Sequence, residues 1–194
     1  MQTLTFELPR DLSLHVSQAE FAAIAAANRD LRLERTAHGQ LIVHPPTGSE
    51  SSRRNIRITA QLWVWAEANP ELGVAFESSG GFTLPSGATR ATDASWVRRE
   101  RWDALTLDEQ ESFAPLCPDF VVELRSKTDN LPKLQDKMCE FMKHGARLGW
   151  LIDSQNQQVD IYRAGQDVEI LERPRQLSGE DVLPGFRLNL KGIL

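Results

Sequence analysis

A short apolar run over residues 118–126 carries charged side chains at regular intervals. In an extended strand, successive side chains point to opposite faces, so Glu123 and Arg125 share one face while Phe120 and Leu124 lie on the other. The predicted strand therefore has one apolar face and one charged face. Metal-dependent hydrolases often hold a divalent cation with a carboxylate on a central strand that points into a cleft. Glu123 is the first candidate ligand, and the alternative is an edge strand with a solvated acidic face.

Helical periodicity predicts three main helices. Ser17 and Glu20 have the spacing of a capping box, which opens a helix that ends near residue 28. The pattern from residue 49 to residue 68 predicts the longest helix. Its apolar positions at helical spacing are Ile56, Ala60, Trp63 and Val64. A third helix begins after a cap at Asp129 or Asn130 and ends at Gly145.

Alternating and apolar runs predict strands around these helices. Residues 148–153 are nearly all apolar, which is typical of a buried strand that pairs in parallel with the strand at 118–126 through the helix between them. Two further alternating strands, over 158–162 and 168–172, complete the sheet. The other predicted strands cover residues 31–35, 40–44, 74–78, 82–84 and 90–97, and short helical pieces cover 99–105 and 107–111.

The composition is that of a single globular domain over residues 1–194. Hydrophobic residues make up 41% and charged residues 25%, and no repeat or linker divides the chain. No apolar run is long enough to span a bilayer, and the first residues lack the features of a signal peptide. We therefore expect a cytoplasmic protein without a membrane partner.

Charge and cysteine usage exclude some classes of function. The net charge of -5 argues against a protein that coats nucleic acid non-specifically, although it leaves room for a local basic patch. Cys117 and Cys139 lie in apolar surroundings, so we expect two buried free thiols. The four histidines lack the spacing of a zinc site.

Two carboxylates are candidates for a metal site. Asp93 and Glu123 each lie in a predicted strand, and acids on neighbouring strands can converge on a hard cation, with the backbone carbonyl of Leu124 as a further oxygen donor. Asp119 precedes Glu123 by four residues, roughly 13 Å along a strand, which is too far to share one ion. We therefore expect Asp119 to be a polar residue at the strand entry.

Lys137 lies beside the apolar stripe of its predicted helix. From that position its ammonium can reach a cleft beside the sheet, where partial burial would lower its pKa toward that of a useful base. The alternative is a lysine that packs its stem on the helix shoulder and keeps its charge in water.

The order and spacing of these residues resemble the Uma-type restriction endonucleases of the PD-(D/E)XK nuclease superfamily. The resemblance covers nearly the whole chain. Its main motifs are residues 91–97 around Asp93, residues 121–126 around Glu123, residues 137–146 from Lys137, and residues 149–153. Shorter matches lie at residues 33–35, 39–41, 46–48 and 183–186.

The resemblance implies an α/β fold with a restriction-endonuclease-like core. Such a core has a central mixed sheet flanked by helices, here with an added N-terminal helix and hairpin, and places the strands of Asp93 and Glu123 side by side. The superfamily usually carries a lysine two residues after the glutamate, where this chain has Arg125. The resemblance implies that Lys137 supplies the lysine from the following helix. It leaves Arg125 as a possible phosphate contact, because a guanidinium stays protonated.

The resemblance also implies a function. We expect a Mg²⁺-dependent endonuclease, with Mn²⁺ as a substitute ion, that hydrolyses phosphodiester bonds in DNA. Asp93, Glu123 and the Leu124 carbonyl would hold the metal, Lys137 would orient or deprotonate water, and Glu34 would extend the site. A hairpin salt bridge is the alternative role for Glu34.

Two other classes of function remain open from the sequence. The first is a catalytically inactive nuclease-fold module that binds nucleic acid or protein, which the negative net charge and the missing strand lysine favour. The second is a purely structural homo-oligomer that pairs through exposed strand edges. A homodimer would also suit cleavage of both DNA strands.

Overall fold

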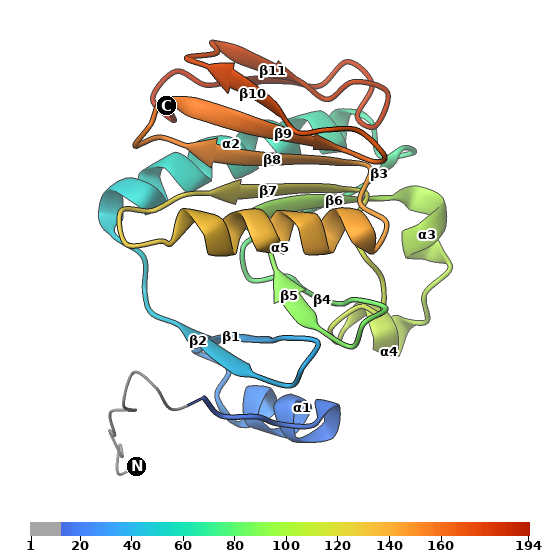
Figure 1. The fold of residues 1–194 in the computed structure, drawn as a ribbon. Helices are drawn as coiled ribbons and strands as arrows, with labels where there is room; N and C mark the ends of the chain where they lie inside the picture. The colour runs from blue at the N-terminus through green and yellow to red at the C-terminus, as the bar shows by residue number, and fades with distance from the viewer. Residues whose placement is uncertain (1–12) are drawn as a thin grey trace.

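The computed structural model describes residues 13–194 and contains a large mixed sheet (Figure 1). Only β7 and β8 run parallel in this sheet, and every other neighbouring pair is antiparallel. In spatial order its strands are β10 (Glu169–Glu172), β9 (Gln158–Arg163), β8 (Leu148–Asp153), β7 (Phe120–Leu124), β6 (Ala94–Arg98) and β3 (Gly73–Glu77). The predicted parallel pairing of the two most apolar strands is therefore confirmed.

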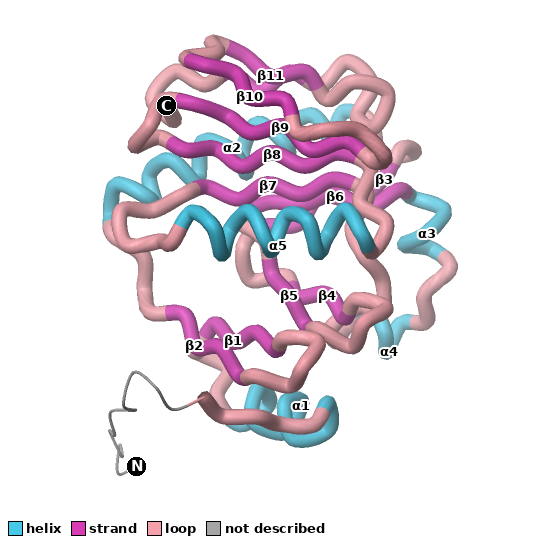
Figure 2. Tube along the Cα trace, in the orientation of Figure 1, coloured by secondary structure: helices cyan, strands magenta, loops and turns pink. Residues whose placement is uncertain are grey.

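Helices cover both faces of the large sheet, as Figure 2 shows. On one face, α2 (Ser49–Ala68) packs Ile58 and Leu62 against Phe120 and the other apolar side chains of that side. On the opposite face, α5 (Leu131–Lys143) packs Met138 and Phe141 against the sheet. A mixed central sheet flanked by helices is confirmed as the fold.

The predicted helix ends have physical causes in the structure. Ser17 and Glu20 form both hydrogen bonds of the capping box at the start of α1 (Gln18–Ala27). Asn130 caps α5 by accepting a hydrogen bond from the Lys133 backbone N–H. The chain turns after α5 at Gly145, whose φ of 113° suits a residue without a Cβ.

A smaller sheet lies beside the large one. Its strands, in spatial order, are β2 (Leu41–His44), β1 (Arg32–Arg35), β5 (Thr89–Ala91) and β4 (Gly81–Thr83). The single strand predicted over residues 90–97 is in fact two strands in different sheets, because the chain bends at Thr92 and Asp93. The Asp93 N–H then bonds to the Val122 carbonyl of β7 at 3.0 Å, which ties the bend to the large sheet.

The apolar stripe that predicts α2 lies on its outer face. Ile56, Trp63 and Val64 are 62%, 55% and 59% exposed, whereas the side chains that face the sheet are Ile58, Leu62 and Ala66. The helix is therefore apolar on two opposite sides.

The remaining elements are short. The helices α3 (Arg99–Asp103) and α4 (Leu107–Gln110) match the two short helical pieces expected from the sequence. The hairpin of β11 (Gln176–Ser178) and β12 (Arg187–Asn189) was not expected. Each of its strands buries a single leucine, too short a pattern to show alternation.

The two cysteines differ in environment. Cys117 is buried, and burial raises the pKa of its thiol to about 12, so it is chemically inert. Cys139 is free but exposed, so the prediction of two buried thiols is wrong for this residue. Its side of α5 does not pack against the sheet, whereas the neighbouring Met138 does. No helix within residues 13–194 is long and apolar enough to cross a membrane.

Candidate active site

Glu123 lies on β7, between β6 and β8 in the large sheet. Alternation sends Phe120, Val122 and Leu124 to the α2 side and Val121 to the α5 side, so Glu123 also points toward α5. Only 5% of Glu123 is exposed, so the alternative of a solvated edge strand does not hold.

Asp119, at the entry to this strand, is held away from Glu123. Its carboxylate accepts a hydrogen bond from the Arg98 N–H at 3.0 Å and pairs with Arg101 at 2.8 Å. The structure therefore agrees with a strand-entry role for this acid.

Asp93 lies in the bend between β5 and β6 rather than within a strand. Its Oδ2 accepts a hydrogen bond from the Leu124 N–H at 2.8 Å, and its Oδ1 accepts one from Asn55 Nδ2 at 2.8 Å. These contacts fix the carboxylate against the end of β7 and leave lone pairs on both oxygens. The bend therefore places Asp93 next to the strand that carries Glu123.

Lys137 on α5 reaches the point where these elements meet. Its Nζ lies 2.9 Å from Glu123 Oε1 and 2.9 Å from Glu34 Oε1, and it donates a hydrogen bond of 2.7 Å to the Ala91 carbonyl. Only 12% of its side chain is exposed, so Lys137 does not keep its charge in water. One ammonium thus joins the large sheet, the small sheet and α5.

Glu34 on β1 is buried among three basic groups. Besides Lys137, it contacts Arg90 Nη1 at 3.1 Å and His44 Nε2 at 3.4 Å. His44 lies across the predicted hairpin, so Glu34 forms a contact within the hairpin and also reaches the Lys137 cluster. Arg90 in turn pairs with Glu140 of α5 at 2.6 Å.

Burial and neighbouring charges shift the pKa values of the cluster. Burial raises the pKa of Glu123 to about 8, and the carboxylates of Asp93 and Glu34 add to this effect while Lys137 opposes it. Burial also disfavours ionised Glu34, but the charges of Lys137, His44 and Arg90 outweigh burial and hold its pKa well below the usual range. The cluster therefore contains two acids with opposite shifts.

The prediction that burial lowers the pKa of Lys137 is wrong. Burial does disfavour the ammonium, but the carboxylates of Glu123 and Glu34 outweigh it and raise the pKa of Lys137 above its usual value. In this arrangement Lys137 is a hydrogen-bond donor and a positive charge, and not a base.

A cleft of about 1650 Å³ opens onto this cluster. Its walls come from the β1–β2 hairpin, the first turns of α2, the loop over residues 126–130 and one side of α5. The candidate residues that line it are Glu34, Asp93, Glu123, Leu124 and Lys137. These residues come from four segments of the chain, namely β1, the bend before β6, β7 and α5, and the fold brings them to one surface.

Arg125 is the predicted site residue that the structure does not bring to the cleft. Its Nη1 pairs with the buried Asp153 Oδ2 at 2.7 Å, and Arg125 is not among the residues that line the cleft. Because β7 ends at Leu124, Arg125 does not continue the alternation that would place it beside Glu123. Its guanidinium instead joins the ends of β7 and β8.

The donor atoms in the cleft suit a hard cation. Carboxylate and carbonyl oxygens are the ligands that Mg²⁺ prefers, and Mg²⁺ usually keeps several waters when few protein groups bind it. Glu123 Oε1 is buried and pairs with Lys137, but it receives no hydrogen bond of good geometry. Within residues 13–194 no three His, Cys, Asp or Glu side chains form a preassembled metal-binding group. A metal would therefore bind through Asp93, Glu123, the Leu124 carbonyl and water.

Sequence reasoning missed two residues that shape the site. Asn55 holds Asp93, and Arg90 holds Glu34 and Glu140. Asn55 lies in the longest helix without any motif around it, and Arg90 lies in a segment that reads as a continuous strand. Only the pairing of β5 with β1 brings Arg90 next to Glu34.

A family model described as "Putative restriction endonuclease" matches residues 18–191 of the chain. The chain belongs to the Uma2 family. The match includes every candidate residue of the cleft and confirms the resemblance seen in the sequence. Comparison with curated protein sequences finds none that is similar to this Uma2 chain.

A solved structure agrees with the fold of this Uma2 protein. The crystal structure of a "putative nuclease belonging to DUF820" from Anabaena variabilis has a TM-score of 0.70 and 20% sequence identity, and the match covers 83% of this chain and 88% of that chain. A cryo-EM structure of a DrdV–DNA complex has a TM-score of 0.37 and 14% identity, over 64% of this chain and 12% of that chain, which is too distant to support a conclusion. The first likeness establishes the fold.

Proposed function

We propose that this Uma2 protein is a metal-dependent endonuclease that hydrolyses phosphodiester bonds in DNA. The family description and the solved structure of the same fold, described as a "putative nuclease", support a nuclease. The observation that carries the proposal is the convergence of Asp93, Glu123, Glu34 and Lys137 on the wall of a large cleft, where Lys137 contacts both glutamates. Buried acids with strongly shifted pKa values in a cleft are typical of functional sites.

Each residue of the cluster has a separate role in this proposal. Asp93, Glu123 and the Leu124 carbonyl would hold Mg²⁺, or Mn²⁺ in its place. The bound ion would supply an acidified water and would polarise the phosphate. Lys137 would donate a hydrogen bond to the attacking water or to a phosphate oxygen, because its raised pKa keeps it protonated.

Glu34 would act on Lys137 rather than on the phosphate. It holds the ammonium from the small sheet, through a contact of 2.9 Å, and Lys137, His44 and Arg90 keep Glu34 ionised. Its lowered pKa makes it a weak base. Glu34 is thus a positioning residue that fixes where the Lys137 donor points.

Cleavage of plasmid DNA tests these roles. We expect the purified protein to cut plasmid in the presence of Mg²⁺ or Mn²⁺, and we expect Glu123→Ala and Lys137→Ala to lower the rate by at least about a hundredfold. Lys191→Ala is the control, because Lys191 is exposed and does not line the cleft. Equal cleavage by all four proteins would refute the assigned roles.

The second candidate function is a nuclease-fold module that binds nucleic acid or protein without turnover. The ion pair between Lys137 and Glu123 favours it, because the ammonium already lies 2.9 Å from one oxygen of a proposed metal ligand. Calorimetric titration with Mn²⁺ separates the two functions. Heat of binding that disappears in Asp93→Asn supports the metal-dependent enzyme, whereas DNA binding without Mn²⁺ binding and without cleavage supports the module.

DNA is the proposed substrate because the cleft offers basic side chains for a phosphate backbone. Four basic residues line it and form no ion pair within residues 13–194, namely Arg32, Lys127, Lys133 and Lys143. Clustered lysines and arginines supply most of the affinity for nucleic acid. Two copies of the chain would present two such clefts to the two strands of a duplex.

A further inference from the structure

The outer face of α2 carries exposed apolar side chains that the sheet does not use. Ile56, Trp63 and Val64 are each more than half exposed, and Ala60 between them is also exposed. At about 100° per residue, these four positions fall within one stripe. Large side chains grouped on one face in this way are typical of a protein–protein contact.

Residues at equal distances before and after Ala60 along α2 carry complementary side chains. Counting outward from Ala60 in both directions pairs Ile56 with Val64 and Arg53 with Glu67. The first pair is apolar with apolar, and the second is positive with negative. A two-fold axis through Ala60 would bring the members of each pair together, because it lays two copies of the helix antiparallel.

We propose that a second copy of this chain packs against the outer face of α2, with a two-fold axis near Ala60. The small Ala60 side chains let the two helices approach closely at the crossing point. Ile56 and Val64 of opposite copies bury apolar area on each side of the axis.

The charges at the ends of the stripe select this partner. Glu67 forms no ion pair within residues 13–194, whereas Arg53 pairs with Glu50 on its own helix, where both side chains are about half exposed, and donates a hydrogen bond to the Gly192 carbonyl at 3.3 Å. The second copy would give Arg53 an additional carboxylate and Glu67 its first cation. A partner of uniform charge would repel one end of the stripe.

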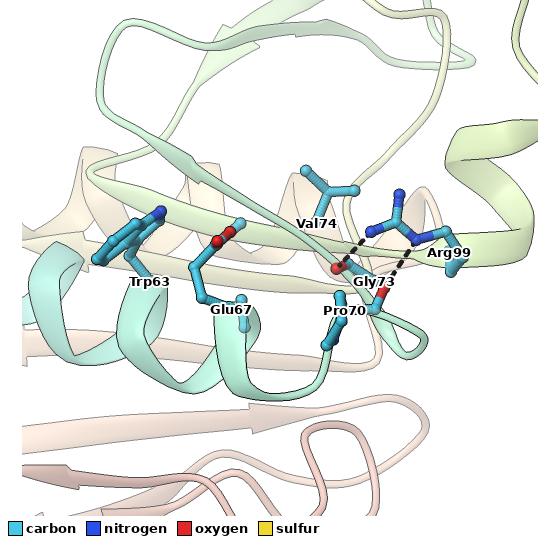
Figure 3. Close-up of a pocket in the computed structure, with 8 residues that line it drawn as sticks. Trp63, Glu67, Pro70, Gly73, Val74 and Arg99 are labelled. Atoms are coloured by element: carbon cyan, nitrogen blue, oxygen red, sulfur yellow. Dashed lines mark hydrogen bonds between the residues drawn. The ribbon is translucent and has the colours of Figure 1, made fainter.

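A small pocket beside Trp63 adds a place for a side chain of the second copy (Figure 3). Its volume is about 90 Å³, and it lies between the last turns of α2 and the edge strand β3, with Glu67, Val74 and Arg99 among its lining residues. Arg99 is fixed there by hydrogen bonds to the Pro70 and Gly73 carbonyls, at 2.9 and 3.4 Å. In the antiparallel arrangement the first turns of α2 of the second copy face this pocket.

Charge reversal tests the pairing in solution by sedimentation velocity. We expect a wild-type dimer, and we expect Arg53→Glu and Glu67→Arg each to weaken association about tenfold or more, since each places like charges together at both ends. An equimolar mixture of the two variants should form a heterodimer, because both ends are then complementary again. Ile170→Glu on β10 is the control, since Ile170 is 57% exposed but lies outside the stripe. A monomeric wild type, or a mixture that stays as weak as the single variants, would overturn the proposal.

Cross-linking tests the position of the axis independently of charge. In a Cys139→Ser background only the buried Cys117 remains, so Ala60→Cys adds one exposed thiol on the axis. We expect mild oxidation to link two copies through position 60. Ala68→Cys is the control, because it would lie about 24 Å from its own copy along the helix axis. Cross-linking at position 68 but not at position 60 would refute the arrangement.

Discussion

At the scale of single residues, the net charge of the cluster depends on how many acids lie close to Lys137. Glu123 is buried beside Asp93 and Glu34, and Lys137 contacts Glu123 and Glu34 together. Glu34 is balanced by Lys137, Arg90 and His44, whereas Asp93 has no ion pair within residues 13–194, so ionisation of Glu123 beside Asp93 adds negative charge that Lys137 offsets only in part. This excess is unfavourable in the free protein and favourable for a site that binds a divalent cation.

The pH dependence of stability provides a test of that excess charge. The pKa of Glu123 is raised from 4.5 to about 8, so in this pH range the folded state holds a proton that the unfolded chain has released. The contribution of Glu123 to the free energy of unfolding is therefore fully present below pH 4.5 and decreases as the pH rises toward 8. Glu123→Gln lacks this loss, so we expect the variant to gain stability relative to the wild type as the pH increases.

Urea unfolding in the presence of a chelator, at the two ends of this pH range, measures the difference. Glu34 does not interfere, because its lowered pKa confines its own titration to more acidic solution. A stability difference between Glu123→Gln and the wild type that does not change with pH would contradict the raised pKa.

At the scale of elements, the site depends on a bend that the sequence pattern conceals. Residues 90–97 alternate well enough to predict one strand, but Asp93 bonds through its backbone and side chain to β7 and directs the chain from one sheet into the other. The helix boundaries, the β7–β8 pairing and the capping box could be predicted, because each has a local pattern of its own. The bend and the β11–β12 hairpin could not, because long-range contacts decide them.

The same distinction applies to the residues of the site. Glu34, Asp93, Glu123 and Lys137 could be selected from the sequence through family resemblance, and the structure brings all four together. The shift of the Lys137 pKa could not be predicted, because its sign depends on two acids that approach from different sheets. The position of Asn55 beside Asp93 likewise depends on how α2 packs.

Asn55 provides a prediction at this scale. Asn55→Ala removes the hydrogen bond to Asp93 Oδ1 and frees the carboxylate to rotate, so we expect Mn²⁺ affinity to fall by about tenfold, as for other residues that orient metal ligands. Gln61→Ala is the matched control, because Gln61 on the same helix hydrogen-bonds to Asn189 and has no contact with Asp93. Calorimetric titration with Mn²⁺ measures both variants. A larger loss in Gln61→Ala than in Asn55→Ala would show that the helix, and not the Asp93 contact, controls binding.

At the scale of the whole molecule, the distribution of charge matters more than its sum. The chain has a net charge of -5, which on its own would repel DNA. Many arginines outside the cleft are already paired with acids, including Arg53, Arg101 and Arg163. The cleft, by contrast, keeps Lys133 and Lys143 without such partners within the described residues. DNA would therefore be attracted to one surface of an otherwise acidic protein.

Salt dependence of DNA binding tests this local attraction. In the Glu123→Gln variant, which we expect not to cut, the logarithm of the binding constant should fall linearly with the logarithm of salt concentration. Lys133→Ala and Lys143→Ala should each reduce the slope by about one, because each would remove one phosphate contact. Lys191→Ala should leave the slope unchanged, since Lys191 is exposed but does not line the cleft. Equal slopes for all three lysine variants would place the DNA on another surface, and the cleft cluster would then need a different substrate.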